Sequence, residues 1–382
     1  MPCHPFASRK TRGAVAGCLL ACALVSILTS CGEGAPAPKA SSTPTNSHPA
    51  HVGLVPAVYE PISQSSANGD TAKKLLGGLG TDFVFRGVFM WGNGLADVSF
   101  KALAANIDQL RDQTPHLLFE GGIGTQFLEP GSTWANGSPI STSDFDNMIA
   151  MDKSGHFLLY NGGPGYVPDL ASALYRSYVI GWGEKQIDAG VDGLLFDDPY
   201  IYADYQVAEM GQNPGETYKN YSGYLFSNPD AVVRSLRAYA ASKGREFFAT
   251  TNLGTCDATR AFIANYPYAV QSNDYISCSF ETQDFDPHAN PSLVPKDDFG
   301  GIVTTIRKFT RRPIITFIDW PSQMTLFQEL STQQQITALT NIYRATKMHG
   351  LYFALPVYVA AQNYDAAADG TYGAMARLVA HT

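Results

Sequence analysis

VDGLLFDDPY, residues 191 to 200, is an apolar run that ends on two neighbouring carboxylates, Asp197 and Asp198, with a proline directly after them. A short run of this kind predicts a strand that is buried on both faces. Together with this run, at 193–199, similar runs rich in β-branched and aromatic residues occur at 83–91, 116–122, 246–252, 275–281, 313–320 and 350–358. Buried strands that alternate with helices are typical of a parallel sheet covered by helices.

Helix-like stretches separate the apolar runs. One helix is expected to begin at Pro168-Asp169, with Asp169 as its N-cap, and to end before Gly190. Further helices are expected over 99–112, 229–243, 297–309 and 332–348. Seven or eight such units predict an α/β fold, a single (β/α)8 TIM barrel whose C-terminal face carries long loops at 123–155 and 199–228. HFLLYN, residues 156–161, is either the third strand or one arm of a hairpin.

The first 52 residues have the composition of an export signal and a tether. Three basic residues within 9–12 precede an apolar stretch at 14–28, which is too short to span a membrane permanently. Leu28-Thr29-Ser30-Cys31 resembles the bacterial lipobox, and this resemblance implies cleavage before Cys31 and a lipid on its sulfur. An ordinary secretory signal is the alternative. We therefore expect a signal peptide over 1–30, a disordered tether over 31–52 and one domain over 53–382.

Either reading of the start of the chain places the mature protein outside the cytoplasm, and the lipid would anchor it to a membrane, periplasmic or at the cell surface. Removing the three basic residues of the signal from the 26 Lys and Arg leaves 23, against 34 Asp and Glu, which is a formal charge of −11. Such a surface repels phosphate backbones, so nucleic acid is not an expected partner. We expect a monomer.

Two cysteines remain once the signal and the lipidated Cys31 are set aside. Cys256 and Cys278 form an even pair in an oxidising compartment, and this predicts a disulfide between them. Two free buried thiols are the alternative.

The strand ends carry the chemistry in a barrel of this type. This sequence places there or directly after Trp91, Glu120, Asp197, Asp198, Tyr200, Asn252, Glu281, Asp319, Trp320 and Tyr358. No strand ends in a histidine or lysine, and the eight histidines lack ligand spacing, so a metal site and a Schiff-base lysine are not expected. No GxSxG elbow or glycine-rich phosphate loop is present. We therefore expect no metal and no cofactor.

A set of carboxylates and aromatic rings suits glycoside hydrolysis. That reaction needs one carboxyl group as a proton donor and another as nucleophile or base, while aromatic rings pack on the apolar faces of sugars. The segment 169–200 also resembles bacterial glycoside hydrolase-like TIM barrels of the exopolysaccharide hydrolase and endo-polygalactosaminidase type. The resemblance covers about thirty residues and includes a helix that ends in glycine, then Asp192-Gly193, three apolar residues and Asp197. It implies that Asp197 is catalytic.

Successive strand residues point to opposite faces, so Asp197 and Asp198 cannot both face a substrate unless the strand breaks at Pro199. We assign Asp197 as nucleophile or base and Glu281 as proton donor, while Asp319 assists or binds a sugar hydroxyl. Substrate contacts are expected from Asp198, Glu120, Asn252, Trp91, Tyr200, Trp320 and Tyr358. Alternatively, Asp197 and Asp198 only cap the following loop.

The substrate class follows from the same residues. We expect a polysaccharide or oligosaccharide outside the cell or in its envelope, and the acidic chain favours neutral or amino sugars over polyanions. A carbohydrate-binding lipoprotein without catalysis and a structural envelope protein are the rival interpretations. Arg86 is the basic residue of the strands that is expected to point inward.

Overall fold

The computed structural model describes residues 55–59, 67–81, 83–95, 98–152, 154–160, 163–199, 229–265, 270–296, 298–319, 322–359 and 364–380. The expected signal and tether, with Cys31, lie outside these ranges, and so do Tyr200, Trp320 and the expected loop from residue 200 onward. None of the helices that the structure describes is long and apolar enough to cross a bilayer.

Eight parallel strands form one curled sheet in chain order. They are β1 (Val55–Tyr59), β2 (Phe83–Met90), β3 (Leu118–Gly124), β4 (Gly193–Asp197), β5 (Phe248–Thr255), β6 (Tyr275–Ser279), β7 (Ile314–Phe317) and β8 (Tyr352–Val359). The first strand, β1, pairs in parallel with β2 on one side and with β8 on the other. A short β9 (Tyr364–Asp365) adds an antiparallel pair to β8. The predicted α/β class is confirmed.

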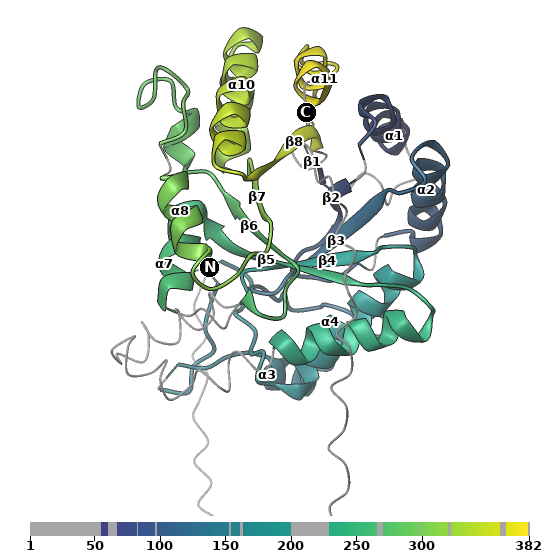
Figure 1. Cartoon of the computed structure of the whole chain (residues 1–382). Helices are drawn as coiled ribbons and strands as arrows, with labels where there is room; N and C mark the ends of the chain where they lie inside the picture. The colour runs from purple at the N-terminus through teal and green to yellow at the C-terminus, as the bar shows by residue number, and fades with distance from the viewer. Residues whose placement is uncertain are drawn as a thin grey trace, which may run out of the picture. The chain divides into compact units, whose positions relative to one another are not determined.

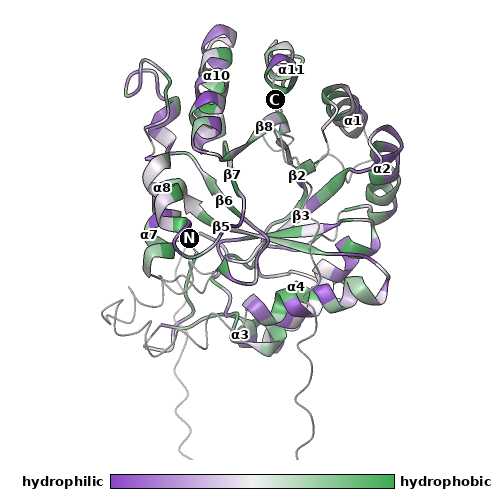
Figure 2. Ribbon diagram, in the orientation of Figure 1, coloured by the Kyte–Doolittle hydropathy of each residue, from purple (hydrophilic) through white to green (hydrophobic). Residues whose placement is uncertain are grey.

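Helices lie outside the strands, as Figure 1 shows. They are α1 (Ala67–Leu79), α2 (Phe100–Gln113), α3 (Thr142–Met148), α4 (Ala173–Asp188), α7 (Cys256–Asn265), α8 (Phe299–Ile306), α9 (Ser322–Glu329), α10 (Thr332–Met348) and α11 (Tyr372–Ala380), with a 3-10 turn η3 (Thr282–Phe285). A further helix covers 229–242. In Figure 2 the strands are mostly hydrophobic in colour, while the helices carry both colours. This is the pattern of strands buried on both faces beneath amphipathic helices.

Aromatic contacts across the inner face show how strongly the sheet curls. Phe83 on β2 lies 5.5 Å from Phe248 on β5 and 5.7 Å from Tyr275 on β6, measured between ring centroids. Two strands separate β2 from β5 in the sheet. Strands lie about 4.8 Å apart, so rings on β2 and β5 of a flat sheet would not meet. The inner face is therefore packed with side chains at its amino end.

The expected start of helix α4 needs correction. Helix α4 begins at Ala173, and its N-cap is Ser172, whose hydroxyl accepts from the backbone N–H of Tyr175 at 3.4 Å. Asp169, the expected N-cap, instead accepts from the N–H of Ala171 at 2.7 Å and forms a turn before the helix. Gly190 follows the helix at φ 103°, as expected of a residue that ends a helix in the left-handed region.

Within the ambiguous segment 156–161, the described residues 156–160 belong to a hairpin. Met151 pairs with Phe157 and Leu159 pairs with Tyr166, both antiparallel, so these residues do not supply a strand of the parallel sheet. The eighth parallel strand is β1, within VPAVY at 55–59, which the pattern of apolar runs did not reveal. Five residues are too few for periodicity to separate a strand from a linker.

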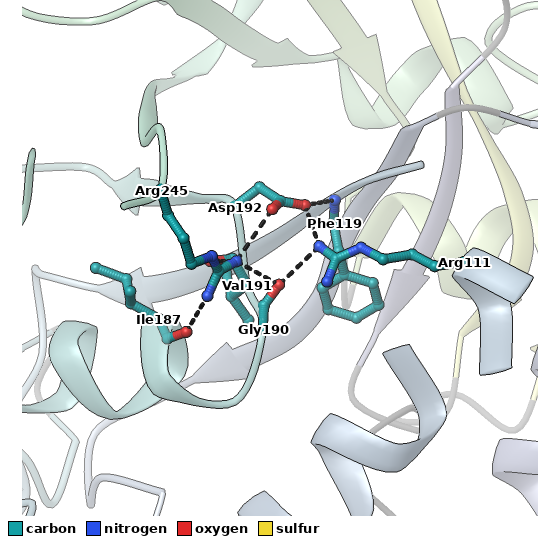
Figure 3. A network of polar contacts seen from close by, with 7 residues as sticks. All are labelled: Arg111, Phe119, Ile187, Gly190, Val191, Asp192 and Arg245. Atoms are coloured by element: carbon teal, nitrogen blue, oxygen red, sulfur yellow. Dashed lines mark hydrogen bonds and ion pairs between the residues drawn. The ribbon is translucent and has the colours of Figure 1, made fainter. Parts of the chain in front are cut away.

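A polar cluster at the amino edge of the sheet joins β3, β4 and α2 (Figure 3). The carboxylate of Asp192 accepts from the N–H of Phe119 at 2.8 Å, from Arg111 at 2.6 Å and from Arg245 at 3.1 Å. Both arginines also donate to the carbonyl of Gly190 at 2.8 Å. Asp192 is therefore a structural residue, at the opposite end of β4 from Asp197.

The same arrangement recurs two strands further on. Asp274 precedes β6 and accepts from the N–H of Ala249 at 2.9 Å and from Arg237 at 2.7 Å, while Arg312 lies 3.7 Å away. In each case one arginine comes from the helix before the preceding strand and the other from the segment before the following strand. These clusters fix the amino edge and leave the carboxyl edge for other groups.

Candidate active site

Asp197 is the last residue of β4 and lies level with two neighbours at the carboxyl edge. It pairs in register with Gly124 on β3 and with Asn252 on β5. Neighbours in register point to the same side of a sheet. Asn252 is two residues beyond Thr250, whose hydroxyl contacts Glu120 across the inner face. Asp197 and Asn252 therefore share the inner face, as expected for Asp197.

Two side-chain amides hold the carboxylate of Asp197. The Asn252 amide donates to Oδ1, and the Gln126 amide donates to Oδ2 at 3.2 Å. The Asp197 carbonyl accepts from the N–H of Thr125 at 3.1 Å and from its hydroxyl at 2.7 Å. Asp197 is 6% exposed, so the carboxylate is oriented and almost entirely shielded from solvent. Gln126 was missed by the sequence analysis because it follows β3 and no spacing links it to Asp197.

The strand breaks at Asp198. Its backbone has φ 47°, in the left-handed region that Asp tolerates better than most side chains. Its N–H donates to the carbonyl of Asn252 at 3.0 Å, so the chain turns away from β4 while it is still bonded to β5. Because Asp198 lies beyond this break, it does not follow the strand alternation that would turn it away from the face of Asp197. Its expected contact with substrate stays a prediction.

Glu120 lies deeper, with no exposed surface. It accepts from the Thr250 hydroxyl and from the backbone N–H of Arg86. Burial raises the pKa of Glu120 from 4.5 to about 8, and the hydrogen bonds and the nearby Arg86 charge only partly oppose this rise. Glu120 is therefore uncharged at neutral pH. Its expected substrate contact stays a prediction, on a side chain below the edge.

Arg86 lies on the inner face of the sheet. The register between β2 and β3 shifts between Val84 and Val88, and Arg86 has φ 53° within this bulge. A bulge re-aims the side chain that it carries. The Arg86 guanidinium lies 4.2 Å from the ring centroid of Phe89 and 5.4 Å from that of Phe317. The expected inward direction of Arg86 is confirmed.

Asp319 follows β7 and pairs with Arg86. The Arg86 Nη1 donates to Asp319 Oδ1 at 3.1 Å, and the side chains are 5% and 29% exposed respectively. Gln323 fixes the backbone here, because it accepts from the Asp319 N–H at 2.8 Å and donates to the Ser279 hydroxyl at 3.1 Å. Sequence reasoning did not anticipate the Arg86–Asp319 pair, which joins residues 233 positions apart.

Glu281 is placed two strands beyond Asp197, at the start of η3. It is half-buried, and its side chain makes no hydrogen bond or ion pair with any residue that the structure describes. The order β4–β5–β6 brings Asp197, Asn252 and Glu281 to three successive strand ends. Strand spacing puts the β4 and β6 backbones roughly 10 Å apart, which a Glu side chain can shorten.

Aromatic rings cover the ends of β2 and β3. Trp91 stacks on Phe127 at 5.4 Å and lies 6.1 Å from Tyr160, between ring centroids. A side chain at Gly124 would come within 2.8 Å of the Trp91 ring, so glycine there lets the ring approach the strand that pairs with Asp197. Tyr358 is buried, and this burial raises its pKa. The expected sugar contacts of Trp91 and Tyr358 stay predictions.

The disulfide between Cys256 and Cys278 is present, with the two Cα atoms 4.8 Å apart. Cys256 follows β5 directly and Cys278 lies in β6, and both are fully buried. The bond therefore clamps the two strand ends that carry Asn252 and Glu281. Within the described ranges, no three His, Cys, Asp or Glu side chains are gathered so that they could hold a metal ion.

Comparisons with known proteins give structural likenesses only. No family model matches the chain, and no curated protein matches it. A variant of the glycoside hydrolase domain of PelA from Pseudomonas aeruginosa is 12% identical, with a TM-score of 0.45, and the match covers 81% of this chain and 96% of that one. The β-galactosidase from the psychrophilic Marinomonas ef1 is 12% identical, with a TM-score of 0.49, and the match covers 84% of this chain and 59% of that one. The α-galactosidase from Thermus thermophilus is 10% identical, with a TM-score of 0.48, and the match covers 86% of this chain and 61% of that one.

The structural neighbours thus include glycoside hydrolases. The matched part of this chain spans about three fifths of the length of the two galactosidases. At these identities and TM-scores, the likenesses assign no activity and no catalytic residue to this chain.

Proposed function

We propose that this protein is an exported glycoside hydrolase that cleaves O-glycosidic bonds in a polysaccharide or oligosaccharide. We infer a (β/α)8 barrel as its scaffold. Asp197 carries the proposal: it is a buried carboxylate at the carboxyl edge, oriented by the amides of Asn252 and Gln126. A carboxylate held in one orientation by two amide donors is placed to attack the anomeric carbon or to take a proton from an attacking water molecule.

Glu281 is the proton donor in this proposal. Its side chain has no partner among the described residues, so it is available to protonate the leaving oxygen. Its place two strands beyond Asp197 suits a reaction in which two carboxyl groups act from opposite sides of one bond. Glu120 is a poorer donor, because it has no exposed surface and its pKa of about 8 is maintained by that burial.

The acidic side chains at the carboxyl edge favour an uncharged or amine-bearing sugar. Asp197, Asp319 and Glu281 are acidic, and Arg86, a cation on the inner face, already pairs with Asp319 at 3.1 Å. A polyanionic chain would meet repulsion at such an edge. The rings of Trp91, Phe127 and Tyr160 lie beside β2 and β3, where an apolar sugar face could stack.

Export and anchoring through Cys31 belong to the proposal as well. The basic start, the apolar stretch and the Leu-Thr-Ser-Cys sequence support them. The buried disulfide agrees with an oxidising compartment. A Cys31→Ser chain that leaves the detergent phase, while the native chain partitions into it, would support the lipid. Equal partition of both chains would rule out a lipid on Cys31.

The test of activity is the release of new reducing ends from a panel of neutral and amino-sugar polysaccharides. The full chain, purified in mild detergent, is compared with Asp197→Asn, which removes the charge and preserves the volume. We expect release by the native chain alone and a loss of at least about a hundredfold in the variant, with both chains folded. Saturable binding without cleavage would favour the carbohydrate-binding alternative. An unfolded Asp197→Asn chain would make the aspartate structural.

A further inference from the structure

The Arg86 side chain is fixed by ring contacts in addition to its ion pair with Asp319. Its guanidinium lies against two rings, Phe89 on β2 and Phe317 on β7, and the strands β1 and β8 lie between these two in the sheet. The side chain is 5% exposed, and it lies within the bulge in β2. Packing on both rings restricts the rotamers of a long side chain that otherwise has many.

Asp319 is the part of this pair that reaches the carboxyl edge. Its side chain is 29% exposed, whereas that of Arg86 is 5% exposed, so a ligand at the edge could touch the carboxylate and not the guanidinium. The backbone of Asp319 is fixed separately by Gln323, which also bonds the Ser279 hydroxyl on β6. The position of the carboxylate is therefore set from below by Arg86 and from the side by Gln323.

The protonation state of Glu120 leaves the Arg86 charge to Asp319. Its carboxyl group accepts from the backbone N–H of Arg86, which stabilises the bulge. Burial raises its pKa to about 8, so at neutral pH it does not compete for the guanidinium charge. An ionised Glu120 would attract the same cation. With Glu120 neutral, the charge of Arg86 is directed to Asp319.

We propose that Arg86 is a positioning residue, which fixes the carboxylate of Asp319 at the carboxyl edge, where Asp319 accepts a hydrogen bond from a hydroxyl group of the bound sugar. This inference rests on the proposed function and adds a residue that determines how tightly the sugar is held. Arg86 does not touch the substrate. Its effect is transmitted through one hydrogen bond, so it should vanish when Asp319 can no longer bind.

The experiment is a double-mutant cycle on the full chain, with Arg86→Met, Asp319→Asn and the two together, using the polysaccharide that the native chain cleaves. Asp319 binds ground and transition states alike in this account, so each single change should raise KM about tenfold and leave kcat within about twofold. The double variant should be no worse than the worse single one, because the two residues act as one unit. Arg86→Lys should recover part of the loss.

The control is Arg237→Lys, in the comparable pair with Asp274 at the amino edge. A purely structural change lowers the fraction of active protein, which reduces the apparent kcat and leaves KM unchanged. If Arg86→Met or Arg86→Lys behaves like this control, the inference is wrong. It is equally wrong if the effects of the Arg86 and Asp319 changes multiply in the double variant.

A second readout does not depend on activity. If the native chain releases no reducing ends, the proposed function fails, and the positioning role is then judged from the crystal structure of the Arg86→Lys chain. We expect the Asp319 carboxylate to move by about 1 Å or more, a displacement that suffices to weaken a directed contact. A carboxylate at its native position would refute the role of Arg86.

Discussion

Asp192→Asn separates the structural aspartate of the Asp192–Asp197 segment from the proposed catalytic one. The Asp192 carboxylate holds Arg111, Arg245 and the N–H of Phe119 at 2.6, 3.1 and 2.8 Å. Asparagine offers one acceptor oxygen and an amide that faces a donor, so at least one of these bonds is lost, and the bonds that remain lose the charge of the carboxylate. Hydrogen bonds to charged groups contribute about 1.5–3 kcal/mol each. The three side chains are 19–27% exposed.

We therefore expect the free energy of unfolding to fall by about 3 kcal/mol. The compact unit spans residues 49–382, and the unfolding entropy of a domain of this size is roughly 0.7 kcal/mol per kelvin. The melting temperature should fall by about 4 °C in calorimetry. Activity per folded molecule should be preserved, since Asp192 lies at the amino edge.

The matched control is Asp188→Asn. Asp188 also contacts a cation, Lys243 at 3.2 Å, but the side chains are 50% and 47% exposed. Surface pairs of this kind contribute little to stability, because solvent screens them. A melting temperature of Asp192→Asn that matches either the native chain or this control would refute the structural role of Asp192.

Three further predictions concern the inner face, the disulfide and a helix end. The pKa of Glu120 is about 8 in the folded chain against an ordinary 4.5, so the folded state binds more protons between these two pH values. The free energy of unfolding should therefore fall as pH rises, by on the order of 5 kcal/mol in all. Urea unfolding from pH 5 to pH 8 should show this slope in the native chain and not in Glu120→Gln, and equal slopes in the two chains would contradict the prediction. Replacing both Cys256 and Cys278 by alanine opens a loop with a sequence separation of 22 and should lower the unfolding free energy by about 3 kcal/mol; an unchanged urea midpoint would rule this out. Gly190→Ala imposes a side chain at φ 103° and should cost about 1–2 kcal/mol, which a native-like midpoint would disprove.

Local pattern was sufficient for much of the architecture. The apolar runs located seven of the eight parallel strands, and the helix expected at 332–348 has the bounds of α10. A capping box of Ser331 and Gln334 marks its start. The Cys256–Cys278 pair also followed from composition and compartment. These features depend on residues near one another in sequence or on simple counting.

The candidate site was only partly accessible to such reasoning. Asp197 at a strand end follows from the sequence alone, because the parallel strands of such a fold end at one edge. Its amide donors could not be paired with it, since Gln126 and Asn252 come from other strand ends. The 3-10 turn after Glu281 and the Ser172 cap of α4 likewise depend on local backbone geometry that propensity does not specify.

The sequence by itself determined the alternation of strands and helices, the acidic carboxyl edge and the place of Asp197. Only the tertiary structure decided that Arg86 pairs with Asp319, 233 residues away, and that Glu120 is buried without charge. It also decided that Asp192 serves the amino edge while Asp197 serves the carboxyl edge. The physical reason is the curl of the sheet, which brings distant strands together and removes water from the groups between them, so that charge and pKa are set by neighbours that the sequence does not place side by side.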